Sequence, residues 1–243
     1  METAARFLTH AQNKLQQVLS SQLANIGQAA DLVTESCLQG GKFYVFGTGH
    51  SHMIAEELYL RAGGLALVHG ILPPEMMLHE MPNKSTYLER LEGYAEALVE
   101  LHRIDAKDTL MVISNSGRNA VPVEMCLAAK AKGAKVIAMT NMRHSSSCTS
   151  RHCSGKKMYE IADVTIDNCG EPGDAAFAID GLDTCIGPTS SITGTAIAQA
   201  LVCQVVENLV KAGMDVPVFK SSNIDGGDEH NHRMFEKYYG YWK

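Results

Sequence analysis

The chain has 243 residues, of which 45% are hydrophobic and 20% charged, ordinary values for a soluble globular protein. Its formal net charge of -6 argues against nucleic-acid binding, and no apolar run reaches the about 18 residues that a membrane span needs. The seven cysteines show no CxxC spacing and the N-terminus lacks the pattern of a signal peptide, so we expect a cytoplasmic protein with free thiols and no membrane partner.

Helix-like and strand-like segments alternate along the chain. Residues 2–37 show helical periodicity, which ends at the glycines of LQGG. Short apolar runs predict strands at 42–47, 65–70, 108–114, 134–141 and 163–168, and we expect helices at 51–62, 86–103, 119–132 and 190–212. The alternation predicts one α/β domain with a five-stranded parallel sheet flanked by helices. We expect an N-terminal helical region at 1–39, a core at 40–213 and a C-terminal tail at 214–243 that contributes to the site.

Two serine-containing turns follow strands of this sheet, at the edge where open α/β sheets bind ligands. GTGHS (47–51) follows the first strand and SNSGRN (114–119) follows the third, and each leads into a helix. Free N–H groups and the positive end of the dipole at a helix start suit phosphate or another tetrahedral oxyanion. Neither turn carries the lysine of a nucleotide-binding P-loop, and GxGxxG is incomplete because residue 52 is histidine, so no organic cofactor is expected. The alternative is that Ser116 or Asn119 simply caps a helix.

These motifs resemble a known family. GTGHSHMIAEEL, followed by ISNSGRNAVPVEM, is similar to the sugar isomerase (SIS) domain, and HCSGKKMYEIADVTIDN, GPTSSITGTAI and SNIDGGDEHNHR are typical of a bacterial branch of sugar isomerases whose reactions are uncharacterised. The resemblance implies a single SIS-type domain, a flavodoxin-like three-layer sandwich, in a homodimer or homotetramer whose neighbouring chains complete each site. It also implies that the substrate's anion is held by the serine turns, at Ser51, Ser114, Asn115, Ser116, Gly117 and Asn119.

Aldose–ketose isomerisation needs a base to move a proton between C2 and C1, and a carboxylate with a raised pKa is suitable. In phosphoheptose isomerases, which this segment resembles, the second glutamate of AEEL is the base, which here is Glu57. Those enzymes have one more helical turn before AEEL. Their zinc-binding histidine lies four residues before the second glutamate, and in this chain that position is occupied by Met53. His52 instead lies four residues before Glu56, so the choice between Glu56 and Glu57 stays open. The alternative is that both glutamates lie on a solvated helix face.

Histidines elsewhere supply further candidates. We expect His230, in the polar tail, to open the sugar ring, unless the tail is merely a surface segment. A divalent metal, zinc or manganese, is an alternative use of His52 and the tail residues Asp228, His230 and His232. A second group comprises His144, Cys148, His152 and Cys153, whose spacing matches no standard zinc finger.

The segment 72–85 follows the second strand and brings two further substrate-binding candidates, His79 and Lys84, unless it is only a structural loop. Taken together, the sequence predicts an aldose–ketose isomerase that acts through an enediolate on an anionic sugar. That sugar is a sugar phosphate or a 6-sulfo sugar such as sulfoquinovose. One alternative is a SIS-fold lyase or etherase in which Glu57 removes a proton beside a carbonyl, and another is a non-catalytic sugar-phosphate sensor.

Overall fold

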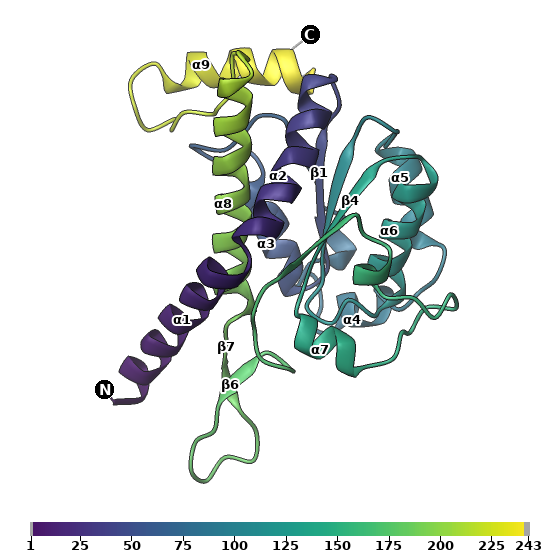
Figure 1. Cartoon of the computed structure of the whole chain (residues 1–243), viewed down its shortest axis with the longest axis vertical. Helices are drawn as coiled ribbons and strands as arrows, with labels where there is room; N and C mark the ends of the chain where they lie inside the picture. The colour runs from purple at the N-terminus through teal and green to yellow at the C-terminus, as the bar shows by residue number, and fades with distance from the viewer. Residues whose placement is uncertain (1, 241–243) are drawn as a thin grey trace.

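The five apolar runs of the sequence form one parallel sheet in the computed structural model, which describes residues 2–240 (Figure 1). The strands are β1 (Phe43–Gly47), β2 (Val68–Ile71), β3 (Thr109–Ile113), β4 (Lys135–Thr140) and β5 (Val164–Asp167). They lie in the order β2-β1-β3-β4-β5, which is the strand order of flavodoxin-like sheets. The predicted fold class is therefore confirmed.

Helices cover both faces of this sheet. The α-helices are α1 (Glu2–Ser21), α2 (Leu23–Leu38), α3 (His50–Leu58), α4 (Lys84–Leu88), α5 (Tyr94–Leu101), α6 (Ala120–Ala131), α7 (Met142–Ser147), α8 (Ser190–Lys211) and α9 (Gly227–Met234). Short 3₁₀ turns lie at η1 (Pro74–Met76) and η2 (Met158–Glu160), and η3 (Phe235–Tyr239) is a π-helical turn. The helix α2 packs on one face with α3 and α8, whereas α5 and α6 pack on the other.

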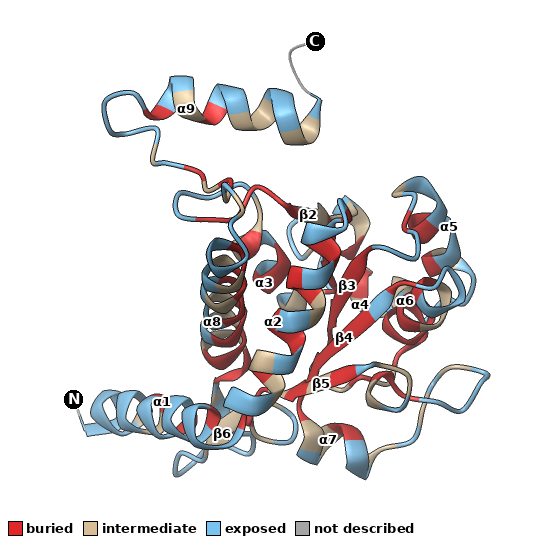
Figure 2. Ribbon diagram, turned by 45° about the horizontal axis from the view of Figure 1, so that its top comes forward, coloured by how far each residue is buried: buried red, intermediate tan, exposed pale blue. Residues whose placement is uncertain are grey.

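Burial on both faces explains why the strands are apolar throughout. All five residues of β1 and all five of β3 are buried, because side chains of alternate direction enter two separate hydrophobic clusters (Figure 2). Phe43 and Val45 of β1 join the cluster under α2, α3 and α8, while Tyr44 and Phe46 join the cluster under α5 and α6.

Two predicted helices are broken in the structure. The helical region expected at 2–37 divides into α1 and α2 at Gln22, whose side-chain Oε1 accepts a hydrogen bond from the backbone of Asp167 at 3.0 Å. The helix expected at 86–103 divides into α4 and α5, and between them Gly93 donates its N–H to the Glu124 carboxylate. In both places a side-chain–backbone hydrogen bond fixes the break.

The sequence did not predict a small antiparallel hairpin, β6 (Ala175–Phe177) and β7 (Ile186–Pro188), which projects away from the sheet (Figure 1). Asp174, at its base, caps α8. Its Oδ1 accepts hydrogen bonds from the N–H groups of Thr189 (3.1 Å) and Ser190 (2.9 Å), and its Oδ2 accepts one from the Ser190 hydroxyl at 2.5 Å. The hairpin is thereby tied to the start of α8.

The polar C-terminal tail, for which no helix was predicted, forms α9 and η3. These lie at the far end of α8 from the hairpin (Figure 1). Asn231 anchors α9, because its side chain accepts from the Lys220 N–H at 2.9 Å and donates to the Lys220 carbonyl at 2.8 Å. Within residues 2–240, no helix has both the length and the apolar character needed to cross a bilayer.

Candidate functional site

A cavity of about 560 Å³ opens at the carboxyl ends of β1 and β3. Gly47 and Ile113, the last residues of the two strands, are paired in the sheet, so the turns that follow them begin side by side. Hydroxyl groups dominate the polar lining. They belong to Thr48, Ser51, Ser85, Thr86, Ser114, Ser116, Ser190 and Ser191. The position is the one that a parallel sheet of this topology offers to ligands.

The first turn folds back tightly on β1. A Cβ atom on Gly47 would lie 2.4 Å from the Ser51 carbonyl oxygen, so only glycine lets α3 begin this close to the strand. Gly49 has a positive φ of 56° and donates its N–H to the Met76 carbonyl at 2.9 Å. This backbone presents Ser51, in the first turn of α3, to the cavity.

The second turn is built on Gly117, which has a φ of 59° and whose added Cβ would lie 3.0 Å from both Ser145 Oγ and Thr140 Oγ1. Ser114 Oγ accepts the Gly117 N–H at 3.2 Å, which fixes the turn. Asn119 stands at the N-cap position of α6 but makes no side-chain cap. The interpretation of Asn119 as a simple helix cap is therefore wrong, and its side chain has another use.

That use is to contact Glu89, a cavity-lining residue that the sequence analysis missed. Asn119 donates to Glu89 Oε1 at 2.7 Å, and Thr48 donates to Glu89 Oε2 at 2.6 Å. Burial is the main cause that raises the pKa of the Glu89 carboxyl, partly opposed by the hydrogen bond from Thr48. A carboxyl group with this environment suits proton transfer near neutral pH. Nothing in the local sequence around Glu89 marks it, because the interaction is tertiary.

Besides Glu89, the titratable residues that line the cavity are His50, His144, Asp174 and Cys185. His144 Nδ1 accepts the Gly173 N–H at 3.3 Å, so the neutral imidazole carries its proton on Nε2. Burial, followed by the charge of Arg118, lowers the pKa of His144 and favours that neutral form. Asp174 is occupied as the cap of α8. No lysine or arginine is among the described residues that line the cavity.

The two adjacent glutamates of α3 point to different places. Glu56 lines a neighbouring groove of about 260 Å³ together with His52 and His79, and this groove shares Gly49 and Leu78 with the cavity. Glu57 faces α8 instead. Its carboxylate pairs with Arg61, and its Oε1 accepts a hydrogen bond from Gln199 Nε2 at 3.1 Å. Within one chain, Glu57 therefore does not line the cavity.

His52 is buried, and its Nε2 lacks a hydrogen-bond partner but lies 3.9 Å from Glu56 Oε1. Burial lowers its pKa, so the imidazole is kept neutral. These two side chains offer two metal ligands. Among residues 2–240, the only group of three or more metal-ligating side chains with ligand atoms within 4.8 Å of one another lies elsewhere.

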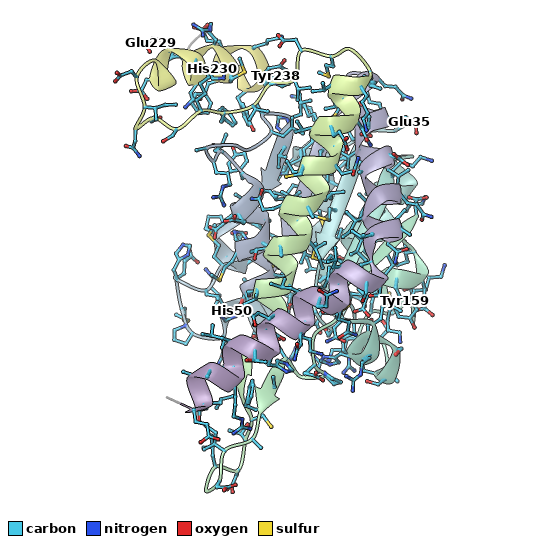
Figure 3. The ribbon with its side chains drawn as sticks, turned by 60° about the vertical axis from the view of Figure 1, so that its left-hand side comes forward. Glu35, His50, Tyr159, Glu229, His230 and Tyr238 are labelled. Atoms are coloured by element: carbon cyan, nitrogen blue, oxygen red, sulfur yellow. The ribbon has the colours of Figure 1, made fainter. Side chains whose placement is uncertain are left out.

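The tail residues do not join His52 in this chain. His230 lies on α9, at one end of the molecule and well away from His50 at the start of α3 (Figure 3). The His230 Nε2 lies 2.8 Å from the Val218 carbonyl oxygen. The proposed metal set of His52, Asp228, His230 and His232 is therefore not assembled among the described residues of one chain: His52 lies in the first turn of α3, whereas the tail contacts the other end of that helix, through Tyr239 and Tyr59. Lys84, which was predicted to bind the substrate, pairs with Glu80 instead. It lines neither the cavity nor the groove.

Comparison with known proteins now decides the family. A sequence model described as the SIS domain matches residues 6–141. The chain belongs to the SIS domain family. It is 56% identical to a UPF0309 protein of Halalkalibacterium halodurans, over 92% of this chain and 93% of the relative. The predicted family resemblance is confirmed.

Solved structures of similar proteins have the same fold as this SIS protein. The phosphoheptose isomerase GmhA from Neisseria gonorrhoeae superposes with a TM-score of 0.59 at 17% identity, covering 85% of this chain and 98% of that one. The sugar isomerase domain of an RpiR transcription factor from Sphaerobacter thermophilus superposes with a TM-score of 0.52 at 14% identity, covering 97% of each chain. At these identities the likeness concerns the fold.

Proposed function

We propose that this SIS protein is an aldose–ketose isomerase of an anionic sugar, either a sugar phosphate or a 6-sulfo sugar such as sulfoquinovose. The observation that carries the proposal is the cavity in which two helix starts and a set of hydroxyls meet a carboxyl group of raised pKa, that of Glu89. The structural likeness to a phosphoheptose isomerase supports the same reaction type. We place the activity in the cytoplasm, in carbohydrate metabolism.

The terminal anion of the sugar is assigned to the starts of α3 and α6. The start of α8 is less suitable, because the Asp174 carboxylate already accepts its first N–H groups. Ser51, Ser114 and Ser116 supply neutral donors around the other two helix starts. Because no lysine or arginine is among the described lining residues, the site would recognise the tetrahedral shape of the oxyanion, which phosphate and sulfonate share.

Glu89 is the proposed base in this cavity. As a carboxylate it would take the proton from C2, leaving an enediolate, and then deliver a proton to C1; exchange of the carboxyl proton with solvent at this stage would bring deuterium into the sugar in D₂O. The hydrogen bonds from Thr48 and Asn119 occupy one site on each oxygen and orient the group. Its raised pKa makes it a stronger base once ionised, which general base catalysis requires.

His144 is the proposed group for ring opening. Its Nε2–H would donate a hydrogen bond to the ring oxygen as the C1–O bond of the ring breaks, while a proton passes from the C1 hydroxyl to that oxygen through water; the neutral form that this needs is favoured because the pKa of His144 is lowered. The hydrogen bond from the Gly173 N–H to Nδ1 fixes the tautomer and the orientation of the ring.

Glu57, which the family resemblance nominates, and His230, expected from the polar tail, stay predictions for a site shared between chains. Neither lines the cavity of its own chain, so each would act only at the cavity of a neighbouring copy in a homodimer or homotetramer. Glu56 and His52 lie in the groove next to the cavity and would act on the end of a longer substrate. No step here depends on a metal.

The test is incubation in D₂O with hexose, pentose and heptose phosphates and with sulfoquinovose, followed by NMR and mass spectrometry. Ketose formation with deuterium at C2 of recovered aldose would establish the isomerase and name its substrate. Elimination of a leaving group would replace this proposal by the lyase or etherase alternative. Binding without exchange or conversion would favour a sensor, the alternative that the likeness to the RpiR domain supports. Repeating the assay with EDTA tests for metal dependence.

A further inference from the structure

The second candidate metal group from the sequence is rearranged in the structure. Of its four members, only His152 and Cys153 come together, and they meet Glu92 from the α4–α5 connection. Ligand atoms of these three side chains all lie within 4.8 Å of one another. A fourth side chain, the carboxylate of Glu124 on α6, lies beside His152. The sequence could not indicate this set, because its members are separated by up to about 60 positions.

The distances between these atoms match the edges of a small coordination tetrahedron. Cys153 Sγ lies 3.7 Å from His152 Nε2, and His152 Nε2 lies 3.5 Å from Glu124 Oε1. Zinc bonds of about 2.3 Å to sulfur and about 2.0 Å to nitrogen or oxygen give tetrahedral edges of about 3.3 to 3.6 Å. Glu92, His152 and Cys153 therefore need only small movements to surround one ion, whereas Glu124, which lies next to His152 but outside that group, would join them after a larger movement.

We propose that Glu92, Glu124, His152 and Cys153 form a binding site for a thiophilic divalent transition metal of the zinc class. A thiolate, an imidazole and carboxylates are a ligand set that such ions accept. The proposal does not rest on the isomerase function, because it concerns a different part of the molecule and a different ligand.

The site is partly preorganised. The side chains of His152 and Glu124 are only 7% and 11% exposed, and Glu124 is held by the Gly93 N–H at 2.8 Å. His152 Nδ1 lies 2.8 Å from Ser154 Oγ and accepts the Ser154 N–H at 3.2 Å, so Ser154 holds the ring in place. Glu92 and Cys153 are exposed, which leaves the outer side open for the ion to enter.

Metal binding at this site exchanges a proton for the ion. A free cysteine has an ordinary pKa of about 8.5, so the metal-free thiol carries a proton at neutral pH. The metal bonds to sulfur as the S–H proton leaves to solvent, and no change in oxidation state is involved. Affinity should therefore fall as pH is lowered.

The site would anchor the loop at 148–157 to α6 and to the α4–α5 connection. Arg151, the residue before His152, donates to Asn119 Oδ1 at 2.9 Å, and Asn119 in turn contacts Glu89 in the cavity. An ion bound at His152 and Cys153 would thus stabilise the position of Arg151. The expected role is structural support of one wall of the cavity.

The test uses full-length protein, reduced and stripped of metal, titrated with Co²⁺ as a spectroscopic substitute for zinc. We expect one equivalent to give the near-ultraviolet thiolate-to-cobalt band and the visible bands of tetrahedral cobalt. Cys153→Ser should abolish the thiolate band, and Glu124→Gln should weaken binding by at least about 10-fold, since even outer-shell changes cost about 10- to 100-fold. Cys203→Ser, at another exposed cysteine, is the matched control and should keep the band.

The His52–Glu56 pair contains no cysteine and cannot produce this band, so the two locations are distinguishable. A second readout is limited trypsin digestion, in which Zn²⁺ should slow cleavage after Arg151 and Lys156 in the wild type but not in Cys153→Ser. Absence of a thiolate band in the wild type, or its persistence in folded Cys153→Ser, would overturn the proposal.

Discussion

Asn119 connects Glu89 to Arg151, because its amide donates to Glu89 Oε1 at 2.7 Å while its carbonyl oxygen accepts from Arg151 at 2.9 Å. Asn119→Ala removes a donor that favours the ionised form of Glu89. We expect the acidic limb of the pH–rate profile to move to higher pH and kcat/KM at neutral pH to fall by about 10- to 100-fold, as for the loss of a hydrogen bond to a charged group. The profile should be unchanged in the control Asn208→Ala, on α8. An unshifted limb in Asn119→Ala would contradict the assigned contact.

Glu89→Gln keeps the shape of the side chain but removes the base. Loss of a general base typically costs about 100- to 10,000-fold, so kcat should fall by that factor while sugar binding, followed by calorimetry, is retained. Glu229→Gln, at an exposed glutamate on α9, is the matched control and should keep full activity. Full activity in Glu89→Gln would remove Glu89 from the mechanism.

The same substitution predicts a pH-dependent gain in stability. Burial raises the pKa of folded Glu89 above the usual value of 4.5, so the folded state binds its proton more tightly than the unfolded state does. Stability is therefore lost as pH rises from about 4.5 through the folded pKa, and the loss persists above it. Glu89→Gln should melt at a higher temperature than the wild type at pH 8, and the difference should shrink towards pH 4. A difference that does not vary with pH would show that Glu89 is not perturbed.

Glu57 is expected to join α3 to α8 through Gln199. A double-mutant cycle with Glu57→Ala and Gln199→Ala, measured by urea denaturation, should give a coupling free energy of about 0.5 to 1.5 kcal/mol. The exposed pair with Arg61 should contribute less, about 0 to 1 kcal/mol. No coupling between Glu57 and Gln199 would mean that the contact does not form in solution.

Whether Glu57 also serves a neighbouring chain can be tested by mixing inactive variants. If Glu57→Gln and Glu89→Gln each lack activity and the site is shared, mixed oligomers should regain part of it, since some cavities then receive Glu89 from one chain and Glu57 from another. Failure to regain activity, in oligomers shown to be mixed, would exclude a catalytic role of Glu57 across the interface.

Gly117→Ala should destabilise the fold more than Gly213→Ala does. Both residues have positive φ, so both substitutions strain the backbone, but an added Cβ at Gly117 lies 3.0 Å from two hydroxyl oxygens and at Gly213 meets nothing within 4 Å. Crowding in a packed region costs about 1 to 3 kcal/mol, which is the expected difference between the two free energies of unfolding in urea. Equal losses would mean that the turn at Gly117 can relax.

The strands were predictable because parallel strands buried on both faces are short continuous apolar runs, as FYVFG of β1 and TLMVI of β3 show. The helix α9 was not predictable in this way. Apart from Gly227 and Met234 its residues are polar, so it shows no hydrophobic period, and it is fixed by hydrogen bonds between Asn231 and the Lys220 backbone. The hairpin after Asp174 lacks a strand pattern for a similar reason, since its residues are only partly buried or exposed.

The residues of the candidate site also fall into two groups, those with a local sequence signal and those placed only by tertiary contacts. The serine turns were predictable, because glycine and serine between a strand and a helix are local signals. Glu89 was not, because it reaches the cavity through contacts with Thr48, 41 positions earlier, and Asn119, 30 positions later. The direction of Glu57 also depends on α8, which packs against α3 only in the folded chain.

The pairing of Gly47 with Ile113 has a thermodynamic consequence for finding the natural ligand. The two turns meet only when β1 and β3 are joined, so a ligand that bridges them binds the folded chain and not the unfolded one. Such a ligand, at 100 times its dissociation constant, adds about 2.7 kcal/mol to the free energy of unfolding. For a domain of this size that corresponds to a melting temperature higher by about 5 to 10 °C. A library of sugar phosphates and sulfonates can therefore be ranked by the rise in melting temperature that each compound causes, before any reaction is known.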